Sequence, residues 1–135
     1  MATTELQRVR TRYSDFKVGL DEHPLSGDVA LSTNASAVKR AVRSLLFTGR
    51  YERRFRPHIG SGLQKYLFEN VSPVTAELIR DSIITTITNF EPRANLISVR
   101  VRVEPDQNSY SATVKFGIVN LPDVVELNEL IRRIR

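Results

Sequence analysis

The chain has 135 residues, 41% of them hydrophobic and 26% charged, and this composition is typical of a single soluble globular domain. It contains no cysteine, which excludes disulfides, thiolate metal sites and thiol nucleophiles. The excess of basic residues gives a net charge of +5 and a pI near 10.0, which suits a solvated basic surface or contact with an acidic partner.

Residues 1–30 are predicted to form an N-terminal arm, because their apolar periodicity is weak. The opening decapeptide MATTELQRVR lacks the apolar core of a secretion signal, so the protein is expected to be made in the cytosol. Residues 31–135 are expected to form one domain. Its first helix has Asn34 as the predicted N-cap and Gly49 as the stop. The apolar stripe of this helix comprises Val38, Ala41, Val42, Leu45 and Leu46.

Residues 50–70, RYERRFRPHIGSGLQKYLFEN, combine arginines with aromatic residues. Proline and glycine interrupt the first part, which predicts an irregular connection followed by a short helix around residues 63–68. Aromatic and basic side chains together can stack on bases and hold phosphates. Tyr51 and Phe55 can instead anchor the loop to the core. This second interpretation is preferred, so no nucleic-acid partner is expected.

The most regular helical pattern of the sequence follows Ser72-Pro73. Serine is a preferred N-cap, and proline fits the first helical position because its missing N–H would be unpaired there anyway. An apolar stripe then runs along the helix through Ile79, Ile83, Ile87 and Phe90. Pro92 is expected to end this helix, since proline disfavours the helical conformation of the residue before it, Glu91.

Two runs of alternating apolar and polar residues come next and predict a β-hairpin with one buried face. The buried face of the first run comprises Ile97, Val99, Val101 and Val103. The buried face of the second run comprises Tyr110, Ala112, Val114, Phe116 and Ile118. An isolated hairpin is marginal in water, so the N-terminal arm or another protein chain is expected to complete the sheet.

The C-terminal segment is predicted to be helical. Asp123, with Glu126 three residues later, resembles a capping box, and the helix is expected to run through Leu130, Ile131 and Ile134. The predicted fold class is therefore α+β, with helices packed on a small antiparallel sheet built on the C-terminal hairpin.

Residues that commonly bind metals or cofactors are sparse. His23 and His58 are the two histidines, and neither has a second ligand at a suitable spacing. No glycine-rich phosphate motif occurs, so neither a metal nor a cofactor is expected. No apolar run approaches the ~20 residues of a membrane span, so no membrane partner is expected.

Three glutamates beside apolar residues, Glu52, Glu69 and Glu91, leave one enzymatic alternative open. A glutamate in an apolar pocket can serve as the general acid of a glycosidase, so the alternative function is a lysozyme-like peptidoglycan glycosidase. Arg53 and Arg93 lie next to two of these glutamates and favour ion pairs instead. A non-enzymatic role is therefore preferred.

An ordered set of short motifs runs through roughly residues 13–119. It contains a helix ending in Leu-Leu, then Gly-x-x-Glu-Arg, Arg-Pro-x-x-Gly, Leu-x-x-x-Leu-Phe-Glu and Glu-Pro-Arg. The residues concerned are Gly49, Glu52-Arg53, Arg56-Pro57, Gly60, Leu63, Leu67-Phe68-Glu69 and Glu91-Pro92-Arg93. The set resembles the baseplate wedge proteins of contractile-tailed bacteriophages, a lysozyme-like family related to type VI secretion baseplate subunits and to the tail-sheath C-terminal domain. Arg50 and Tyr51 depart from it, since the family often has glycine directly before Glu-Arg.

The resemblance implies a structural protein of the virion tail baseplate, assembled in the host cytoplasm at six copies per baseplate. Its expected partners are other baseplate wedge proteins and the tail sheath protein, with tail tube and hub proteins as further candidates. The chain is expected to dock on the wedge core and to initiate sheath assembly by offering β-strands to sheath arms.

The resemblance also assigns residues to these roles. Glu91, Pro92 and Arg93 are the expected docking corner, with Arg93 making a forked contact to a wedge partner; the alternative is an internal salt bridge at a helix stop. Glu52, Arg53 and Arg56 are expected to brace the core against Glu91 or to contact a neighbour. Strand addition is expected at both strands of the hairpin, at Val99, Val101, Val103, Val114, Phe116 and Ile118.

Overall fold

The computed structural model describes residues 12–134, and the chain divides into two compact units, one ending at Ala37 and the other beginning at Val38. The opening decapeptide, in which no secretion signal is expected, lies outside the described residues. Within those residues, no helix is long and apolar enough to cross a membrane.

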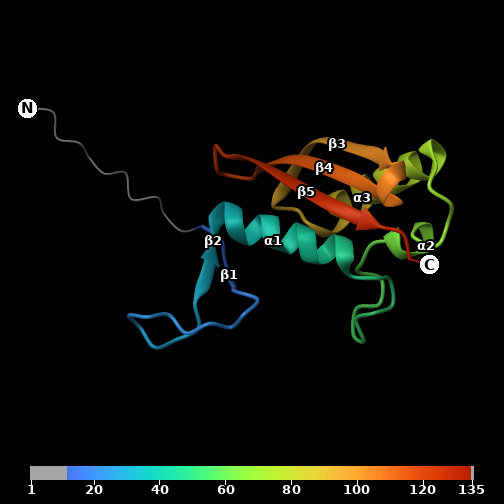
Figure 1. Ribbon diagram of the computed structural model, residues 1–135. Helices are drawn as coiled ribbons and strands as arrows, with labels where there is room; N and C mark the ends of the chain where they lie inside the picture. The colour runs from blue at the N-terminus through green and yellow to red at the C-terminus, as the bar shows by residue number, and fades with distance from the viewer. Residues whose placement is uncertain (1–11, 135) are drawn as a thin grey trace, which may run out of the picture. The chain divides into compact units, whose positions relative to one another are not determined.

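The first unit contains a small hairpin of its own (Figure 1). Strand β1 (Ser14–Phe16) pairs antiparallel with β2 (Leu31–Thr33), and the two form a separate two-stranded sheet. A hydrogen bond from the Lys17 N–H to the Ala30 carbonyl, 3.1 Å long, continues the pairing. The N-terminal arm therefore does not supply the strand that the C-terminal hairpin was expected to need.

Asn34 begins helix α1 (Asn34–Phe47), at the residue predicted from the sequence. Its side chain has another role than the predicted capping, because Asn34 Oδ1 accepts hydrogen bonds from the backbone N–H groups of Arg12 (2.9 Å) and Tyr13 (3.4 Å). Asn34 also adopts a positive φ of 47°, which asparagine tolerates better than most residues. It thus closes the base of the first hairpin while α1 begins.

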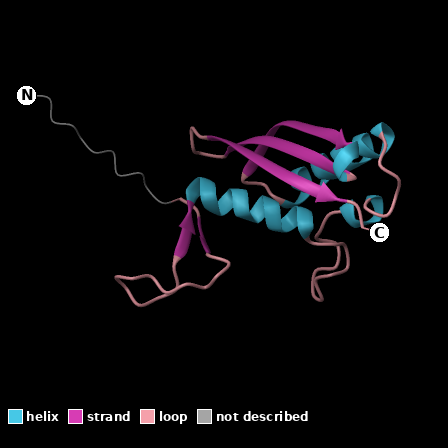
Figure 2. Ribbon diagram, viewed as in Figure 1, coloured by secondary structure: helices cyan, strands magenta, loops and turns pink. Residues whose placement is uncertain are grey.

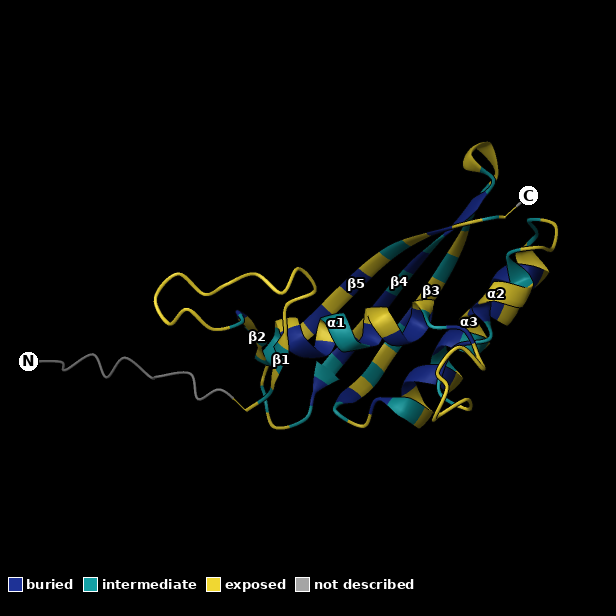
Figure 3. Cartoon of the chain, turned by 90° about the horizontal axis from the view of Figure 1, so that it is seen from below, coloured by how far each residue is buried: buried dark blue, intermediate teal, exposed yellow. Residues whose placement is uncertain are grey.

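The second unit is a three-stranded antiparallel sheet with helices on one face (Figure 2). The strands are β3 (Ala94–Glu104), β4 (Ser109–Ile118) and β5 (Val124–Arg132), and β4 lies in the centre. Figure 3 shows α1 and α3 (Pro73–Phe90) on the same side of this sheet. The fold is therefore α+β, as predicted from the sequence.

The core of this unit lies between the sheet and the two helices. From α1 and α3 it takes the predicted stripes, of which Val38, Val42, Leu45, Leu46, Ile79, Ile83 and Ile87 are buried. From the sheet it takes alternate residues of β4 and β5, namely Tyr110, Ala112, Val114, Phe116, Ile118, Val125, Leu127 and Ile131. Burying these apolar side chains is the main source of stability for this unit.

The β3–β4 hairpin is confirmed, with one local difference. Its two strands pair from Ala94 with Ile118 to Glu104 with Ser109, and a short 3-10 turn, η1 (Pro105–Gln107), joins them. A bulge between Leu96 and Ser98 leaves Ile97 without a partner on β4 and 59% exposed. Ile97 therefore does not join Val99 in the core, because the extra residue shifts the alternation there.

The predicted C-terminal helix is wrong, because this segment forms strand β5. Val125, Leu127 and Ile131 are buried while their neighbours in sequence are exposed, which is the alternation of a strand. The strand pairs with β4 along its length, from Val124 with Gly117 to Arg132 with Ser109. A hairpin alone would leave the backbone of β4 unpaired on one side, and β5 satisfies those groups within the chain.

Helix α3 begins and ends as predicted. Ser72 Oγ accepts a hydrogen bond from the Thr75 N–H at 3.1 Å, and Pro73 occupies the first turn. The helix ends at Phe90, after which Glu91 leaves the helical conformation. The short helix α2 (Leu63–Tyr66) is also confirmed, with Leu63 buried. The buried Tyr110 ties the α2–α3 connection to the sheet, since its hydroxyl accepts from the Ser72 N–H at 3.2 Å.

Candidate partner-binding surfaces

The Glu91–Pro92–Arg93 corner joins α3 to β3. Arg93 Nε lies 2.7 Å from Glu91 Oε1, and Arg93 Nη2 lies 2.9 Å from Glu91 Oε2. The guanidinium therefore donates one hydrogen bond to each carboxylate oxygen. The carboxylate is buried, whereas the Arg93 side chain is 32% exposed and Pro92 is exposed. The internal salt bridge, which was the alternative from sequence, is therefore present, and the forked contact expected for a partner is made to Glu91.

Backbone hydrogen bonds fix this corner on both sides. The Glu91 N–H donates to the Ile87 carbonyl at 3.0 Å, which holds the corner to the last turn of α3. The Ala94 N–H donates to the Glu91 carbonyl at 3.1 Å, and the Val119 N–H donates to the Arg93 carbonyl at 2.9 Å. The corner is thus tied to α3 and to the end of β4, so it presents one defined geometry.

The loop between α1 and α2 contains the other residues named from sequence. Glu52 Oε2 accepts a hydrogen bond from the Gly49 N–H at 2.6 Å, so Glu52 closes the turn that follows α1. Arg53 and Arg56 are exposed, and within residues 12–134 neither forms an ion pair. They therefore do not brace the core against Glu91 through an ion pair, and their contact with a neighbour stays a prediction.

Tyr51 and Phe55 do not anchor this loop to the core. Tyr51 is 82% exposed and Phe55 is 98% exposed. The loop instead approaches the corner through His58, whose ring centroid lies 6.2 Å from that of Phe90 at the end of α3. The periodicity of the sequence could not reveal this exposure, because irregular loops have no repeating face.

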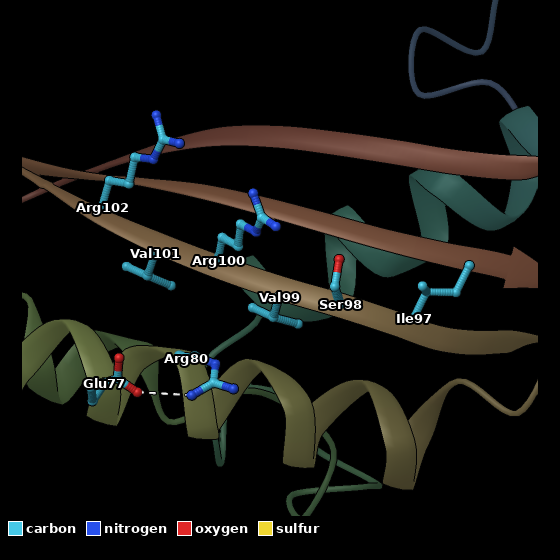
Figure 4. Close-up of a pocket in the computed structure, with 8 residues that line it drawn as sticks. All are labelled: Glu77, Arg80, Ile97, Ser98, Val99, Arg100, Val101 and Arg102. Atoms are coloured by element: carbon cyan, nitrogen blue, oxygen red, sulfur yellow. Dashed lines mark hydrogen bonds and ion pairs between the residues drawn. The ribbon is translucent and has the colours of Figure 1, made fainter.

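The open edge of β3 borders a groove with a volume of about 550 Å³ (Figure 4). Residues 97–102 line one side, and Glu77 and Arg80 of α3 line the other, where Arg80 Nη1 lies 2.9 Å from Glu77 Oε2. Figure 4 shows Val99 and Val101 on the side facing α3, and Arg100 and Arg102 on the opposite side of the strand. An extended segment laid here would meet an unpaired strand backbone and a helix.

Strand addition at β4 is excluded by the topology. Val114, Phe116 and Ile118 are buried on the central strand, which is paired with β3 on one side and β5 on the other. Of the predicted strand-addition residues, those on β3 (Val99, Val101 and Val103) lie on an outer strand. The open edges of this sheet are therefore those of β3 and β5.

The carboxylates proposed for glycosidase chemistry are not arranged for it. Both oxygens of Glu91 are held by Arg93, Glu52 accepts from a backbone N–H, and Glu69 is exposed rather than in an apolar pocket. A glycosidase needs a carboxyl group that can reach the glycosidic oxygen of its substrate, and both oxygens of Glu91 are instead bonded within the chain. Within residues 12–134, no group of three or more His, Cys, Asp or Glu residues is placed to hold a metal ion.

The ion pair between Arg43 of α1 and Glu129 of β5 was not predicted, because the C-terminal segment was expected to be a helix. Glu129 of β5 is on the strand face that carries Leu127 and Ile131, and its Oε1 lies 2.7 Å from Arg43 Nε of α1. The ion pair joins the sheet to the helix at the rim of the core. In the sequence, the only signal for this ion pair was the acidic Glu129 at a position where the apolar alternation calls for an apolar residue.

The family model described as "Baseplate wedge protein gp25" matches residues 32–120. Baseplate wedge protein gp25 of Enterobacteria phage T4 is 29% identical over 99 residues, which is 73% of this chain and 75% of that protein.

Two solved structures share the fold. A chain in the cryo-EM structure of the anti-feeding prophage baseplate aligns with a TM-score of 0.70 and 26% identity, covering 82% of this chain and 89% of that chain. A Geobacter sulfurreducens protein named as a tail lysozyme aligns with a TM-score of 0.71, covering 78% of this chain and 96% of that one. The identity of the second pair is 22%, so this likeness concerns the fold alone.

Proposed function

The chain belongs to the baseplate wedge protein gp25 family, and from this membership we propose that it docks on the core of the baseplate wedge and initiates assembly of the tail sheath. Membership itself supports a structural role in a phage tail baseplate. The proposal assigns docking to the Glu91–Pro92–Arg93 corner and strand addition to the open edge of β3. The further partners are other wedge proteins and tube or hub proteins. Each baseplate contains six copies of this chain and is assembled in the host cytoplasm.

The observation that carries the docking proposal is the fork between Glu91 and Arg93. The buried carboxylate holds the guanidinium in one orientation, and the 32% of Arg93 that stays exposed lies beside the exposed Pro92. A partner would then meet a planar cation that is already ordered, so binding loses little side-chain entropy. The internal salt bridge is therefore compatible with docking, because it fixes the orientation of the Arg93 guanidinium that a partner would contact.

The groove beside β3 supports the proposal for strand addition. An incoming strand can pair with the unpaired N–H and C=O groups of this edge, and α3 gives the groove a second wall. Backbone hydrogen bonds would supply most of the affinity, so the sequence of the added strand matters mainly where it meets Val99 and Val101. We therefore assign strand addition to the β3 edge, although β5 is also an outer strand.

Reconstitution tests the docking proposal. The purified chain, wedge proteins and sheath protein are mixed, and sheath-like tubes are counted by electron microscopy. Arg93→Ala is expected to abolish wedge binding and tube growth. Because it leaves the buried Glu91 charge unpaired, Glu91→Gln combined with Arg93→Ala is the second variant. Lys115→Ala, which breaks an exposed ion pair on the sheet, is the matched control. If both Arg93 variants fold and still support tubes, the corner does not dock.

Amide hydrogen exchange tests strand addition without a mutation. Addition of sheath protein is expected to protect amides of β3, while amides of the central strand β4 are already protected and change little. Protection gained only in β5, or in neither outer strand, would contradict the assignment to β3.

A further inference from the structure

The exposed segment between α1 and α2, residues 50–56, is here called the basic-aromatic loop. It reads RYERRFR and contains four arginines, one glutamate and two aromatic residues. All seven residues are exposed, and Phe55 has 98% of its surface free. Singly exposed apolar residues are common on soluble proteins, but here two exposed aromatic side chains, Tyr51 and Phe55, lie four residues apart among four arginines.

Backbone contacts hold the base of this loop in one conformation. The Ser61 N–H donates to the Thr48 carbonyl at 2.8 Å, and Tyr51 N–H donates to the Pro57 carbonyl at 2.9 Å. Gly60 packs directly against the backbone of Gly49, where an added Cβ would lie 2.6 Å from the carbonyl oxygen. The loop is therefore preorganised, and its tip presents Phe55 without further ordering of the base.

The charge of the loop is unbalanced. Four arginines and one glutamate give +4 − 1 = +3 over residues 50–56. The Glu52 carboxylate is engaged with the Gly49 N–H, and within residues 12–134 none of these four arginines forms an ion pair. Tyrosine, phenylalanine and arginine are enriched in protein interfaces, and tyrosine and arginine are also enriched among their hot spots.

We infer that the basic-aromatic loop is a docking element that inserts Phe55 into an apolar pocket on an acidic protein surface. The inference rests on the proposed function in taking the partner to be a protein of the baseplate. The arginines supply charge complementarity around the pocket, and Tyr51 adds contact area at its rim. The contact of His58 with Phe90 puts the base of the loop beside the docking corner, so one partner can touch both.

A protein fits this surface better than a nucleic acid does. A nucleic-acid backbone requires a continuous basic track. Here Glu52 interrupts the loop, and Asp81 lies with Arg50 and Lys65 in the adjacent groove of about 230 Å³. Two carboxylates, those of Glu52 and Asp81, therefore lie among the basic residues of this surface.

Photo-crosslinking in assembling particles tests the inference. Phe55 is replaced by p-benzoylphenylalanine in cells that assemble the tail, the cells are irradiated, and the adduct is mapped by mass spectrometry. The expected adduct joins residue 55 to a baseplate protein, at an apolar peptide flanked by acidic residues. The same replacement at Phe68, which is 62% exposed outside the loop, is the control and is not expected to give this adduct. No adduct at position 55, an adduct to nucleic acid, or one to a peptide without acidic residues refutes the inference.

Substitutions give a second readout. Phe55→Ser is expected to lower the amount of this chain in purified particles by about tenfold or more, since truncating a central aromatic anchor has effects of this size. Arg53→Glu with Arg54→Glu is expected to do the same, while Arg53→Lys with Arg54→Lys keeps most incorporation. All these positions are exposed, so unchanged thermal unfolding verifies the fold. If Phe55→Ser incorporates normally, the loop does not dock. If the Arg93→Ala variant is incorporated normally and the Phe55→Ser variant is not, the basic-aromatic loop docks and the Glu91–Pro92–Arg93 corner does not.

Discussion

Replacing Gly60 by alanine should destabilise the protein more than its position in a surface loop suggests. Gly60 adopts a φ of +141°, a conformation that residues with a Cβ rarely adopt. The Cβ added by Gly60→Ala would lie 2.6 Å from the Gly49 oxygen and 2.8 Å from the Thr48 oxygen. Both contacts are with backbone atoms, so no flexible side chain can move aside.

The magnitude follows from two contributions. Holding a non-glycine residue in such a conformation costs about 1–3 kcal/mol. Relieving the contact would separate Gly60 from the end of α1 and weaken the hydrogen bond from the Ser61 N–H to the Thr48 carbonyl, which adds about 1 kcal/mol. We therefore expect Gly60→Ala to lower the free energy of unfolding by about 3 kcal/mol, and Tm by about 10 °C.

Urea unfolding followed by circular dichroism measures this change. Gly117→Ala is the matched control, because a Cβ there meets nothing within 4 Å and should leave stability within about 0.5 kcal/mol of the wild type. If Gly60→Ala also stays within about 0.5 kcal/mol, the close approach of these backbones does not constrain the loop, and the base of the loop is not preorganised.

Three further variants test the core, the sheet and its surface charges. Ile83→Ala removes a fully buried side chain of α3 and should lower the free energy of unfolding by about 2–5 kcal/mol in the same assay. Tyr110→Phe removes a hydroxyl that pairs with the connection before α3, and should cost about 1–2 kcal/mol with no change in the circular dichroism spectrum. The pKa of Glu126 lies below its ordinary value of 4.5. The hydrogen bond from Asn128 is the largest cause, and the hydrogen bond and positive charge of Lys115 come next. Its stabilising contribution is therefore complete above that value and disappears as pH falls through the lowered pKa, so wild type and Glu126→Gln should differ slightly at neutral pH and converge in acid.

Local signals placed α3 and the β3–β4 hairpin correctly. Ser72-Pro73 and Pro92 mark the helix ends through backbone chemistry that depends on neighbouring residues only. The adjacency of Glu91 and Arg93 likewise made an internal ion pair one of two interpretations. Their fork at 2.7 and 2.9 Å confirms the pair, and the role of the corner in docking stays a proposal.

The C-terminal segment shows where local signals failed. Leu127, Leu130, Ile131 and Ile134 recur at helical spacing, while Val125, Leu127 and Ile131 also fit alternate positions of a strand. Leu127 and Ile131 suit both periods, so the sequence alone could not choose. Strand β4 makes the choice, because a strand beside it pairs backbone groups that a helix would leave without partners.

The loop between α1 and α2 is the second such case. Proline and glycine predicted an irregular connection, which is confirmed, but they carry no information on which side chains face water. The contact of Gly60 with the Gly49 backbone fixes the loop base and leaves Phe55 outside the core.

The sequence by itself determined the fold class, the ends of α3 and the hairpin, because these depend on residue type and on spacing along the chain, and its ordered motifs carried the resemblance to the family. Only the tertiary structure decided that the last strand completes the sheet, that β4 is closed to partners, and that Phe55 and its arginines face outward. Those features depend on which backbone edges and side-chain faces are already occupied by distant parts of the chain, and no local pattern encodes that occupancy.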